Sequence, residues 1–515
     1  MLKQFLIITQ QKWKEKDNKT YPYNIIEKVE TIPSNAYLNN MIPTIVRQKG
    51  SIANDLEPTY SEKEIILNDG MNGRPCWVTY RDGVYDITDF IPYHPGGEDF
   101  IRLAAGGAVD SFWKYWSAHH HSLQVAEQLE KCRIGKFKLD DDSDEVLDSP
   151  FYESEPPRSS HIQPLTVQPW DSQTESSILS KTYYTPSDVF YIRNHAPVPE
   201  TDITSHTIEF MDKDGIVKCN MSIDTLFSKF KKKNVTSILQ CAGNRAMENI
   251  EMAGQSVFSG TNGEYIDIGM VGNAKWGGVG LMDVLKDVYP DIQKIINYHI
   301  VFFGADGYFT SVPLNKIINS NRESECLLAT EMNDEPLTPD HGYPIRVLLP
   351  GIIGARNVKW VTQIQIQENE SDSCWNQNYY KQQITIQNKV QPSCVELPII
   401  NSMITSINNF DRNQYEIKGV AYNSEGILLK CIEISVDKGT TWSYVKNMKN
   451  TSSKFGWIQW SYIIKKNEII HNEIWCRATD VNGNQQPSIG IPKRINVKNG
   501  GGYLYNGWHR KKILK

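Results

Sequence analysis

The chain has 515 residues and a formal net charge of −6, because 54 lysine and arginine residues face 60 aspartate and glutamate residues. Its length exceeds what one hydrophobic core usually supports, which predicts about three domains. The mild acidic excess argues against nucleic acid or an anionic membrane surface as the main partner, no apolar run is long enough to span a membrane, and nine cysteines without a C-x-x-C pair are not typical of a disulfide framework. We therefore expect a soluble protein with reduced, mostly buried thiols.

Residues 1–57 are interpreted as an N-terminal extension. The opening stretch is basic, carries an apolar patch and has no acidic residue before Glu15, which fits the rough pattern of a mitochondrial import segment. Its low content of arginine and serine does not fit that pattern. A disordered or loosely docked extension is an equally good interpretation.

Residues 58–138 predict a small α+β domain. They include CWVTYRDGVYDITDF, in which β-branched and aromatic residues flank a D-G turn, a pattern typical of a hairpin. Residues 139–163 combine an acidic run with Pro-Pro and serine. We interpret this stretch as a linker, because such a composition cannot bury a core.

Residues 164–395 predict a large α+β body, with strand-like runs such as TSILQC and HIVFFG and a helical pattern in GLMDVLKDVY. Residues 396–515 carry short β-rich runs (YEIKGVAY, KCIEISVD, EIWCRATDV) separated by turn-forming residues. Their spacing is typical of a β-sandwich, and we expect an immunoglobulin-like one. The expected fold class is therefore multidomain, with two α+β domains followed by a C-terminal sandwich.

His94 stands in an HPGG turn, ahead of LAAGGAVDSFWKYW and three consecutive histidines. Pro95 restricts this turn, and Gly96 and Gly97 place no Cβ in the way of a flat macrocycle. Imidazole is a common axial ligand of haem iron, and two such ligands leave no open position for oxygen. The pattern therefore indicates a haem site for electron transfer.

The block WVTYRDGVYDITDF followed by HPGG resembles cytochrome b5 over residues 58–138. The resemblance implies a b-type haem whose first axial ligand is His94. For the subgroup that continues with AAGG and FW, it places the second ligand at His119, with His120 as the alternative.

Cys241 follows a strand-like run and precedes a small-residue turn in SILQCAGNRAMEN. By spacing alone, a single cysteine of this kind is more often a buried structural residue than a ligand. Three long blocks change that interpretation: LQCAGNR, FYIRNHAPVP and DHGYPIRVLLPGIIGARNVKW resemble the molybdopterin domain of the sulfite oxidase and eukaryotic nitrate reductase family. A pterin dithiolene and one soft cysteine thiolate are chemically sensible ligands for molybdenum.

The resemblance also implies a role for each matching residue. Cys241 becomes the molybdenum ligand, and Arg193 and Tyr380 stand beside the reacting oxo group, with Tyr379 as the alternative for the tyrosine. Arg193 would bind the oxyanion, and Tyr380 would orient it or take part in proton movement. The implied contacts to the cofactor are Tyr191, Arg193, Asn194, His195, Asp306, His341, Arg346, Asn357, Val358 and Lys359.

The order of the domains separates the members of this family. The haem unit comes first here, whereas plant-type nitrate reductases carry it after the molybdopterin body. The order resembles animal-type sulfite oxidases, which implies oxidation of sulfite to sulfate, transfer of electrons through haem to cytochrome c, a homodimer, and the mitochondrial intermembrane space. Two alternatives stay open: a nitrate-reducing enzyme fed by a separate reductase, and a haem electron carrier with a degenerate molybdenum domain.

The chain departs from the family pattern at two positions near the expected oxyanion pocket. After CAGNR the family usually has a second arginine, where this chain has Ala246, and a further arginine of the sandwich domain is replaced by Ile458. We hypothesise that Arg193, helped by Arg245 or Lys275, supplies the remaining charge. Fewer charge-assisted contacts predict weaker sulfite binding, or tolerance of a different oxyanion.

Overall fold

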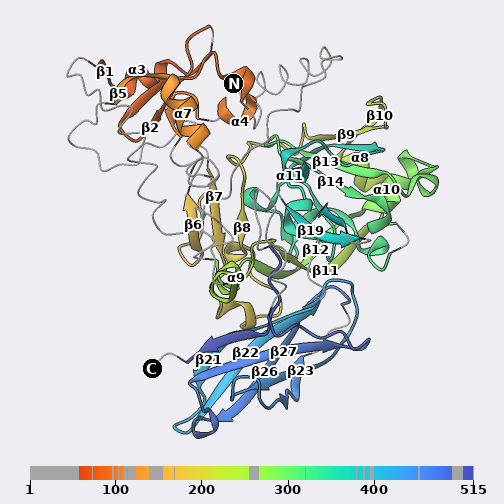
Figure 1. The fold of residues 1–515 in the computed structure, drawn as a ribbon. Helices are drawn as coiled ribbons and strands as arrows, with labels where there is room; N and C mark the ends of the chain where they lie inside the picture. Colours follow the sequence, from red (N-terminus) through yellow and green to blue (C-terminus); the bar gives the residue numbers. More distant parts are fainter. Residues whose placement is uncertain are drawn as a thin grey trace.

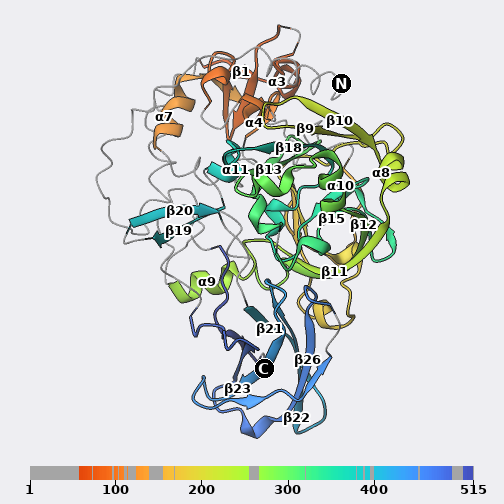
Figure 2. The same ribbon diagram turned by 90° about the vertical axis from the view of Figure 1, so that its right-hand side faces the viewer.

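The computed structural model describes residues 57–71, 73–94, 98–102, 104–109, 113, 123–137, 155–167, 169–253, 266–318, 320–377, 380–386, 389–394, 400–449, 453–489 and 503–513. Three bodies follow one another along the chain. Both ribbon views place the N-terminal unit (orange) and the strands after residue 400 (blue) at opposite ends, with the central body between them (Figures 1 and 2).

The N-terminal unit is one five-stranded sheet with short helices around it. The strands are β1 (Thr59–Tyr60), β2 (Trp77–Tyr80), β3 (Gly83–Asp86), β4 (Gly107–Ala108) and β5 (Arg133–Phe137), in the order β1-β5-β3-β2-β4. The helical segments are α3 (Glu62–Leu67), η1 (Ile91–Tyr93), α4 (Glu98–Arg102) and α7 (Leu123–Lys131). The expected hairpin is confirmed, because Tyr80 pairs with Gly83 across a two-residue turn. A capping box between Ser61 and Glu64 begins α3.

The central body contains two five-stranded sheets. The first has the order β10-β9-β18-β13-β14, and the second has the order β11-β12-β15-β16 with β17 added on β15. The first sheet consists of β9 (Thr207–Met211), β10 (Val217–Ser222), β13 (His299–Gly304), β14 (Phe309–Pro313) and β18 (Val361–Gln367). The second consists of β11 (Lys232–Gln240), β12 (Val271–Gly280), β15 (Leu327–Met332), β16 (Glu335–Pro336) and β17 (Arg346–Leu348). The runs TSILQC and HIVFFG thus form β11 and β13, as the sequence predicts.

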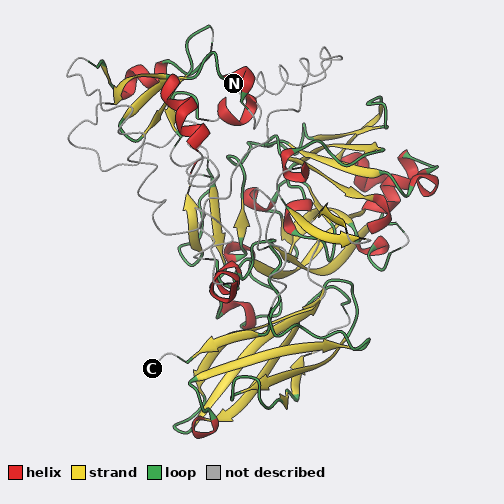
Figure 3. Cartoon of the chain, in the orientation of Figure 1, coloured by secondary structure: helices red, strands yellow, loops and turns green. Residues whose placement is uncertain are grey.

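Smaller elements complete the central body. A three-stranded sheet has the order β6-β7-β8, and β19 and β20 form a hairpin. These strands are β6 (Gln163–Val167), β7 (Trp170–Gln173), β8 (Ile192–Arg193), β19 (Lys381–Ile386) and β20 (Lys389–Cys394). The α-helices are α8 (Ile223–Lys229), α9 (Ala246–Ala253), α10 (Leu281–Val288) and α11 (Cys374–Gln377), and the 3-10 turns are η3 (Ile178–Ser180), η4 (Ser187–Val189), η6 (Ile292–Ile295), η7 (Leu314–Lys316), η8 (Glu323–Glu325), η9 (Pro339–His341) and η10 (Gly354–Arg356). Strands outnumber helices throughout this body (Figure 3).

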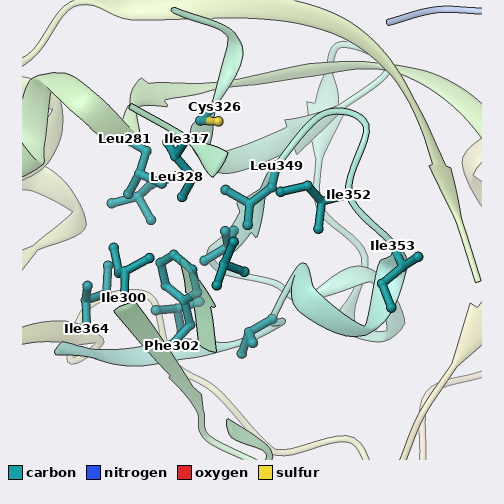
Figure 4. Packing of buried hydrophobic residues seen from close by; sticks show 14 of the residues in the cluster. Leu281, Ile300, Phe302, Ile317, Cys326, Leu328, Leu349, Ile352, Ile353 and Ile364 are labelled. Atoms are coloured by element: carbon teal, nitrogen blue, oxygen red, sulfur yellow. The ribbon is translucent and has the colours of Figure 1, made fainter. Parts of the chain in front are cut away.

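The core of the central body joins its two five-stranded sheets. Ile300 and Phe302 of β13 and Ile364 of β18 belong to the same buried cluster as Leu328 of β15 (Figure 4). The predicted helix in GLMDVLKDVY is α10, whose Leu281 and Leu285 are fully buried in this cluster. Close packing of these large aliphatic side chains from the two sheets fixes the sheets against each other. The strand ends that carry the polar residues described below are fixed as a result.

The C-terminal body is a sandwich of two four-stranded antiparallel sheets. One sheet has the order β21-β22-β26-β25 and the other β24-β23-β27-β28. The strands are β21 (Ile400–Asn409), β22 (Gln414–Asn423), β23 (Leu429–Ser435), β24 (Ser443–Tyr444), β25 (Asn447–Lys449), β26 (Ile458–Lys465), β27 (Glu473–Asp480) and β28 (His509–Lys512), with η11 (Lys466–Glu468) between two of them. Both inner faces contribute to one apolar cluster. The predicted strands in this region are confirmed, and the immunoglobulin-like topology stays a prediction.

The end of the predicted linker is packed onto the central body. Ile162 is buried, and Arg158, whose side chain is 8% exposed, forms an ion pair with Asp340. From residue 155 onward this stretch therefore has fixed neighbours, although its composition alone indicates a solvated tether. The acidic part of the stretch lies outside the described residues.

Of the nine cysteines, the seven whose side chains the structure describes are free thiols, and four of these are buried. None of the helices in these ranges is long and apolar enough to cross a membrane.

Candidate active site

A pocket of about 650 Å³, measured with its open mouth, lies in the central body where loops that follow several strands meet. Its wall contains the following residues expected from the sequence: Tyr191, Arg193, His195, Cys241, Asp306, His341, Arg346, Asn357, Val358, Lys359 and Tyr380. These residues come from segments far apart in the chain, so the tertiary fold brings the predicted set together.

Cys241 directly follows β11 and is 8% exposed. Its backbone N–H donates to the carbonyl of Met270 at 2.9 Å, which continues the pairing of β11 with β12 by one residue. The N–H of Gly243 donates to the sulfur of Cys241 at 3.4 Å. Burial raises the pKa of the Cys241 thiol, and the charge of Arg193 opposes that shift. A cation bound in the pocket would favour the thiolate further.

Arg193 ends the short strand β8 and faces the same pocket as Cys241. Its guanidinium donates to Asp171 Oδ1 at 3.2 Å and to the carbonyl of Asn194 at 2.6 Å. Two anchored donors hold the planar group in one orientation, which is what recognition of an oxyanion requires.

Two further cations stand in the wall: Arg346, which is buried, and Lys359, which is partly buried. Arg346 donates to the carbonyls of His341 and Asn357, each at 3.0 Å, and burial lowers its pKa to about 10. Lys359 Nζ donates to the carbonyl of Asp340 at 2.8 Å and to the side chain of Asn194. Burial also lowers the pKa of Lys359. An anionic ligand bound beside them would favour the charged form of both side chains.

Tyr380 and His195 form a hydrogen-bonded pair at the pocket. The Nε2 atom of His195 lies 3.1 Å from Tyr380 Oη. Burial holds the pKa of His195 well below 6.5 and raises the pKa of Tyr380 to about 12. Tyr380 adopts a positive φ of 49°, an uncommon conformation for a residue with a large side chain. The alternative tyrosine, Tyr379, lies outside the described residues.

His341, Asp306 and Tyr191 occupy the remaining polar positions of the wall. Burial lowers the pKa of His341 to about 4, and its Nε2 atom lies 3.1 Å from the carbonyl of Ser187, so the ring is a neutral donor near pH 7. Burial raises the pKa of Asp306. Burial likewise raises the pKa of Tyr191, whose hydroxyl stays protonated. Tyr191 can therefore donate a hydrogen bond to a ligand without adding negative charge, whereas the Nε2 proton of His341 is directed at Ser187 and Asp306 accepts from the N–H of Tyr308 at 3.1 Å.

Asn357 fixes the backbone beside the pocket through its side chain, and Val358 does so through its carbonyl. The side chain of Asn357 accepts from the N–H of Leu349 at 2.6 Å and donates to the carbonyls of Ile352 and Ile353. The N–H of Val347 donates to the carbonyl of Val358 at 2.8 Å. Asn194, the one expected contact that does not line the pocket, stands behind Lys359 and Asp340 and bonds to both.

Sequence reasoning missed several residues of this wall. Asp340 lines the pocket and is held by Arg158, whose Nε and Nη2 atoms bond to its carboxylate at 2.9 and 2.7 Å. Tyr308 and Trp360 also line it. Asp340 and Trp360 stand inside or beside the quoted DHGYPIRVLLPGIIGARNVKW block, so a charged residue directly before His341 was a usable signal. No local signal connects Arg158 to this site.

The hypothesis that Arg245 or Lys275 supplements the oxyanion pocket is wrong. Neither residue is among the described residues that line it. Arg245 is fully buried, donates to Glu248 and Asn401, and so turns toward the C-terminal sandwich. Lys275 pairs with Asp334 near the surface.

The structure also does not support the expectation that the residues at positions 246 and 458 weaken oxyanion binding. Ala246 is fully buried at the start of α9 and Ile458 belongs to the core of the C-terminal sandwich. Neither is among the described lining residues. An arginine at either position would have to displace packed neighbours before it could reach the pocket. The absence of arginine at these two positions therefore says nothing about the charge of the pocket.

Of the two haem ligands expected in the N-terminal unit, His94 lies within the described residues. His94 follows η1 and is half-buried, and its ring meets the ring of Phe90 edge-on at 6.0 Å. The nearby apolar cluster includes Ile91, Ala105 and Trp113. His119 and its alternative lie outside the described residues. An imidazole beside an apolar cluster fits one axial position of a haem.

The central pocket fits a molybdopterin-type cofactor by the chemistry of its residues. It combines one cysteine sulfur with the cations Arg193, Arg346 and Lys359 and several neutral donors. A Cβ at Gly354 would come within 2.8 Å of Tyr191 Oη, so the wall needs a glycine at that position to keep its shape. A soft ligand for a metal and fixed cations for a phosphate are the two features that such a cofactor requires.

Three family models match the chain in order. The cytochrome b5-like haem/steroid binding domain matches residues 61–138, the oxidoreductase molybdopterin binding domain matches residues 195–375, and the Mo-co oxidoreductase dimerisation domain matches residues 382–515. The two expected cofactors, haem and molybdopterin, are thereby confirmed at the level of their domains.

Relatives extend over most of the chain. The mitochondrial sulfite oxidase of Drosophila melanogaster is 33% identical over 88% of this chain and 81% of its own length, and the sulfite oxidase of Gallus gallus is 31% identical over 88% of this chain and 99% of its own. A nitrate reductase of Brassica napus is 31% identical, but the match covers 64% of this chain and 38% of that protein.

The solved sulfane dehydrogenase SoxCD of Paracoccus pantotrophus shares the fold over 73% of this chain and 96% of its own, with a TM-score of 0.55 and 21% identity. The fold, the pocket chemistry, the three domains in order and the extent of the sulfite oxidase matches agree. This chain therefore belongs to the sulfite oxidase family of molybdopterin oxidoreductases and carries an N-terminal cytochrome b5-like domain.

Proposed function

We propose that this enzyme oxidises sulfite to sulfate in the central pocket and passes the two electrons, one at a time, through a b-type haem. The overall change is sulfite plus water giving sulfate, two protons and two electrons. The observation that carries this proposal is the joint placement of Cys241, Arg193 and Tyr380 at one buried, cation-lined pocket. A degenerate molybdenum domain would not be expected to keep this set.

The residues that would hold the cofactor are those of the wall. Cys241 is the proposed protein ligand of molybdenum, and Arg346 and Lys359 would compensate anionic groups of the pterin. When bound, the molybdenum cofactor supplies two-electron oxygen-atom transfer, and haem supplies one-electron transfer. His94 and His119 are the proposed axial ligands of the haem iron.

The reacting anion is bound and oriented by the chain's own groups. Arg193 would bind the oxyanion, because its guanidinium faces the pocket while Asp171 and the Asn194 carbonyl keep its orientation. Tyr380 would orient the anion by donating a hydrogen bond from its hydroxyl. This hydroxyl stays protonated at neutral pH, because its pKa is raised to about 12. His195 fixes the position of that hydroxyl.

The remaining parts of the proposal concern the setting of the enzyme. We propose cytochrome c as the electron acceptor and a homodimer formed through the C-terminal domain, which matches the dimerisation family model. We also propose the mitochondrial intermembrane space as its location, supported by relatives named as mitochondrial sulfite oxidases. The acidic stretch before residue 155 would tether the haem domain.

One experiment tests the function and its alternatives together. The purified full chain is analysed for molybdenum and iron, and its oxidised haem band is followed after mixing with sulfite without oxygen. Sulfite should reduce the haem, and cytochrome c should then reoxidise it. Iron without molybdenum would support an electron carrier instead.

The nitrate alternative needs the opposite direction of electron flow. The haem is first reduced chemically, and nitrate is then added under the same conditions. Reoxidation by nitrate without any reduction by sulfite would replace the proposal by a nitrate-reducing enzyme, to which the partial match with a nitrate reductase points. The Cys241→Ser variant serves as the matched control in both directions, because it should abolish molybdenum-dependent electron flow and leave the haem intact.

A further inference from the structure

The last described segment of the chain returns from the C-terminal sandwich to the candidate active site. Tyr503, Leu504 and Tyr505 precede β28, which pairs with β27 in the sandwich. Leu504 is buried in the apolar cluster of the central body, and Tyr503 packs against the same cluster. The segment therefore has its strand in one body and its apolar side chains in the other.

Tyr503 contacts Tyr380. The centroids of the two rings lie 5.3 Å apart with an interplanar angle of 32°. Tyr380 carries a positive φ of 49°, so its conformation has to be imposed by its surroundings. His195 holds the hydroxyl end of Tyr380, and Tyr503 supports the ring itself.

Leu504 contacts the loop that follows Cys241. Its backbone N–H donates to the carbonyl of Ala242 at 2.9 Å. Leu504 itself has a φ of 67°, so the chain bends sharply at the point of this contact. The hydrogen bond joins the C-terminal segment to the residue next to the proposed molybdenum ligand.

Tyr505 contacts the far end of the same loop. The guanidinium of Arg245 lies over the Tyr505 ring, with its central carbon 4.9 Å from the centroid. Arg245 also has a positive φ, of 65°, and its other partners are Glu248 at 2.8 and 2.7 Å and Asn401 of β21 at 2.8 Å. A strained residue held by several buried partners keeps the loop in one conformation.

We propose that Tyr503, Leu504 and Tyr505 form a brace that positions the molybdenum site. Tyr503 is a positioning residue for Tyr380, while Leu504 and Tyr505 hold the loop from Cys241 to Arg245. This inference rests on the proposed function, because it takes Cys241 and Tyr380 as the reactive groups. The C-terminal domain thereby contributes to catalysis within its own chain, separately from any role in dimerisation.

The first test uses Tyr503→Leu, which removes the ring and keeps apolar volume. Its kcat for sulfite should fall about tenfold, with KM changed less than about twofold, because an aromatic contact of this kind orients Tyr380 without binding the anion. Tyr503→Phe should restore most of the rate. The matched control is Tyr415→Leu, which removes a tyrosine ring packed on the sandwich core beside Lys466 and is not among the described residues that line the pocket.

A double-mutant cycle separates positioning from general destabilisation. If Tyr503 acts through the hydroxyl of Tyr380, then adding Tyr503→Leu to Tyr380→Phe should change kcat no further. All variants are compared at equal molybdenum and haem content. Independent, multiplying losses in the double variant would overturn the assignment of Tyr503, as would a loss in Tyr415→Leu equal to that in Tyr503→Leu.

The second test needs no turnover. In cofactor-free protein, the rate at which iodoacetamide alkylates Cys241 is measured by mass spectrometry for the unaltered chain, Tyr505→Leu and Tyr505→Phe. Loss of the ring should raise the rate at Cys241 several-fold, while Cys326, fully buried in the core of the central body, reports any global opening. Equal increases at both thiols, or none at Cys241, would reject the brace at this loop.

The two tests also distinguish the brace from the function on which it rests. If the fully loaded enzyme does not react with sulfite, the proposed function fails, and the alkylation rates still report whether Tyr505 holds the Cys241 loop. If sulfite is oxidised but neither kcat nor alkylation responds to the variants, the function stands and the brace is rejected.

Discussion

Replacing Arg158 by methionine tests whether the end of the linker supports the cofactor pocket. Arg158 and Asp340 are 8% and 7% exposed, and two hydrogen bonds of 2.9 and 2.7 Å join them. The guanidinium also lies 4.5 Å from the ring centroid of Trp170. Methionine keeps much of the apolar stem and removes the charge. The variant leaves the buried carboxylate of Asp340 with Asn194 as its remaining side-chain donor, and it also removes the ion-pair partner of Glu155.

The size of the effect follows from the loss of a buried ion pair. Breaking such a pair by removing one partner costs about 3–5 kcal/mol. We therefore expect Arg158→Met to lose about 3–5 kcal/mol of unfolding free energy in the central body.

Urea unfolding followed by tryptophan fluorescence measures this loss, and the haem band of the same sample reports the N-terminal unit, which should not change. Molybdenum content should fall as well, because Asp340 and Asn194 position Lys359. Asp340→Asn is the control: combined with Arg158→Met, it removes the charge left at Asp340 and should recover part of the stability, while Glu155 stays without its arginine. A single variant as stable as the unaltered chain, or a double variant no better than the single one, would refute the reasoning.

Three further predictions concern single side chains. Cys241→Ser should retain the pterin but almost no sulfite turnover, because a hard hydroxyl replaces the soft thiolate; full activity would reject Cys241 as the ligand. His94→Ala should abolish the low-spin haem spectrum and leave molybdenum content unchanged, since the two bodies have separate cores; a normal spectrum would contradict the ligand assignment. Burial, and secondarily Arg245, holds the pKa of His509 well below 6.5, so its ring stays neutral and stability should fall by about 1.4 kcal/mol per pH unit below about 6.5 as the unfolded chain binds the proton. His509→Asn keeps an acceptor for the N–H of Ile404 and should flatten urea midpoints between pH 7 and pH 5.5; an unchanged pH dependence would exclude His509 as its source.

The sequence alone determined the elements and most of the pocket set. The hairpin of the N-terminal unit, β11, β13 and α10 follow from local periodicity and turn residues, which report on neighbours within a few positions. Most of the pocket residues followed from three contiguous blocks, each of which keeps its own internal spacing. The structure places Arg193 and Cys241 at one pocket, as those blocks imply, together with Asp306 and Tyr380, which lie outside them.

Only the tertiary structure decided the contacts between distant segments. Arg245 adjoins Cys241 in sequence, yet its positive φ turns its side chain away from the pocket and toward Asn401. Arg158 reaches Asp340 and Tyr503 reaches Tyr380 across more than a hundred positions, and no local pattern carries that information. The physical reason is that a buried charge or a strained backbone takes its partners from whatever the packed core brings within reach, whereas sequence periodicity specifies only which face of an element is buried.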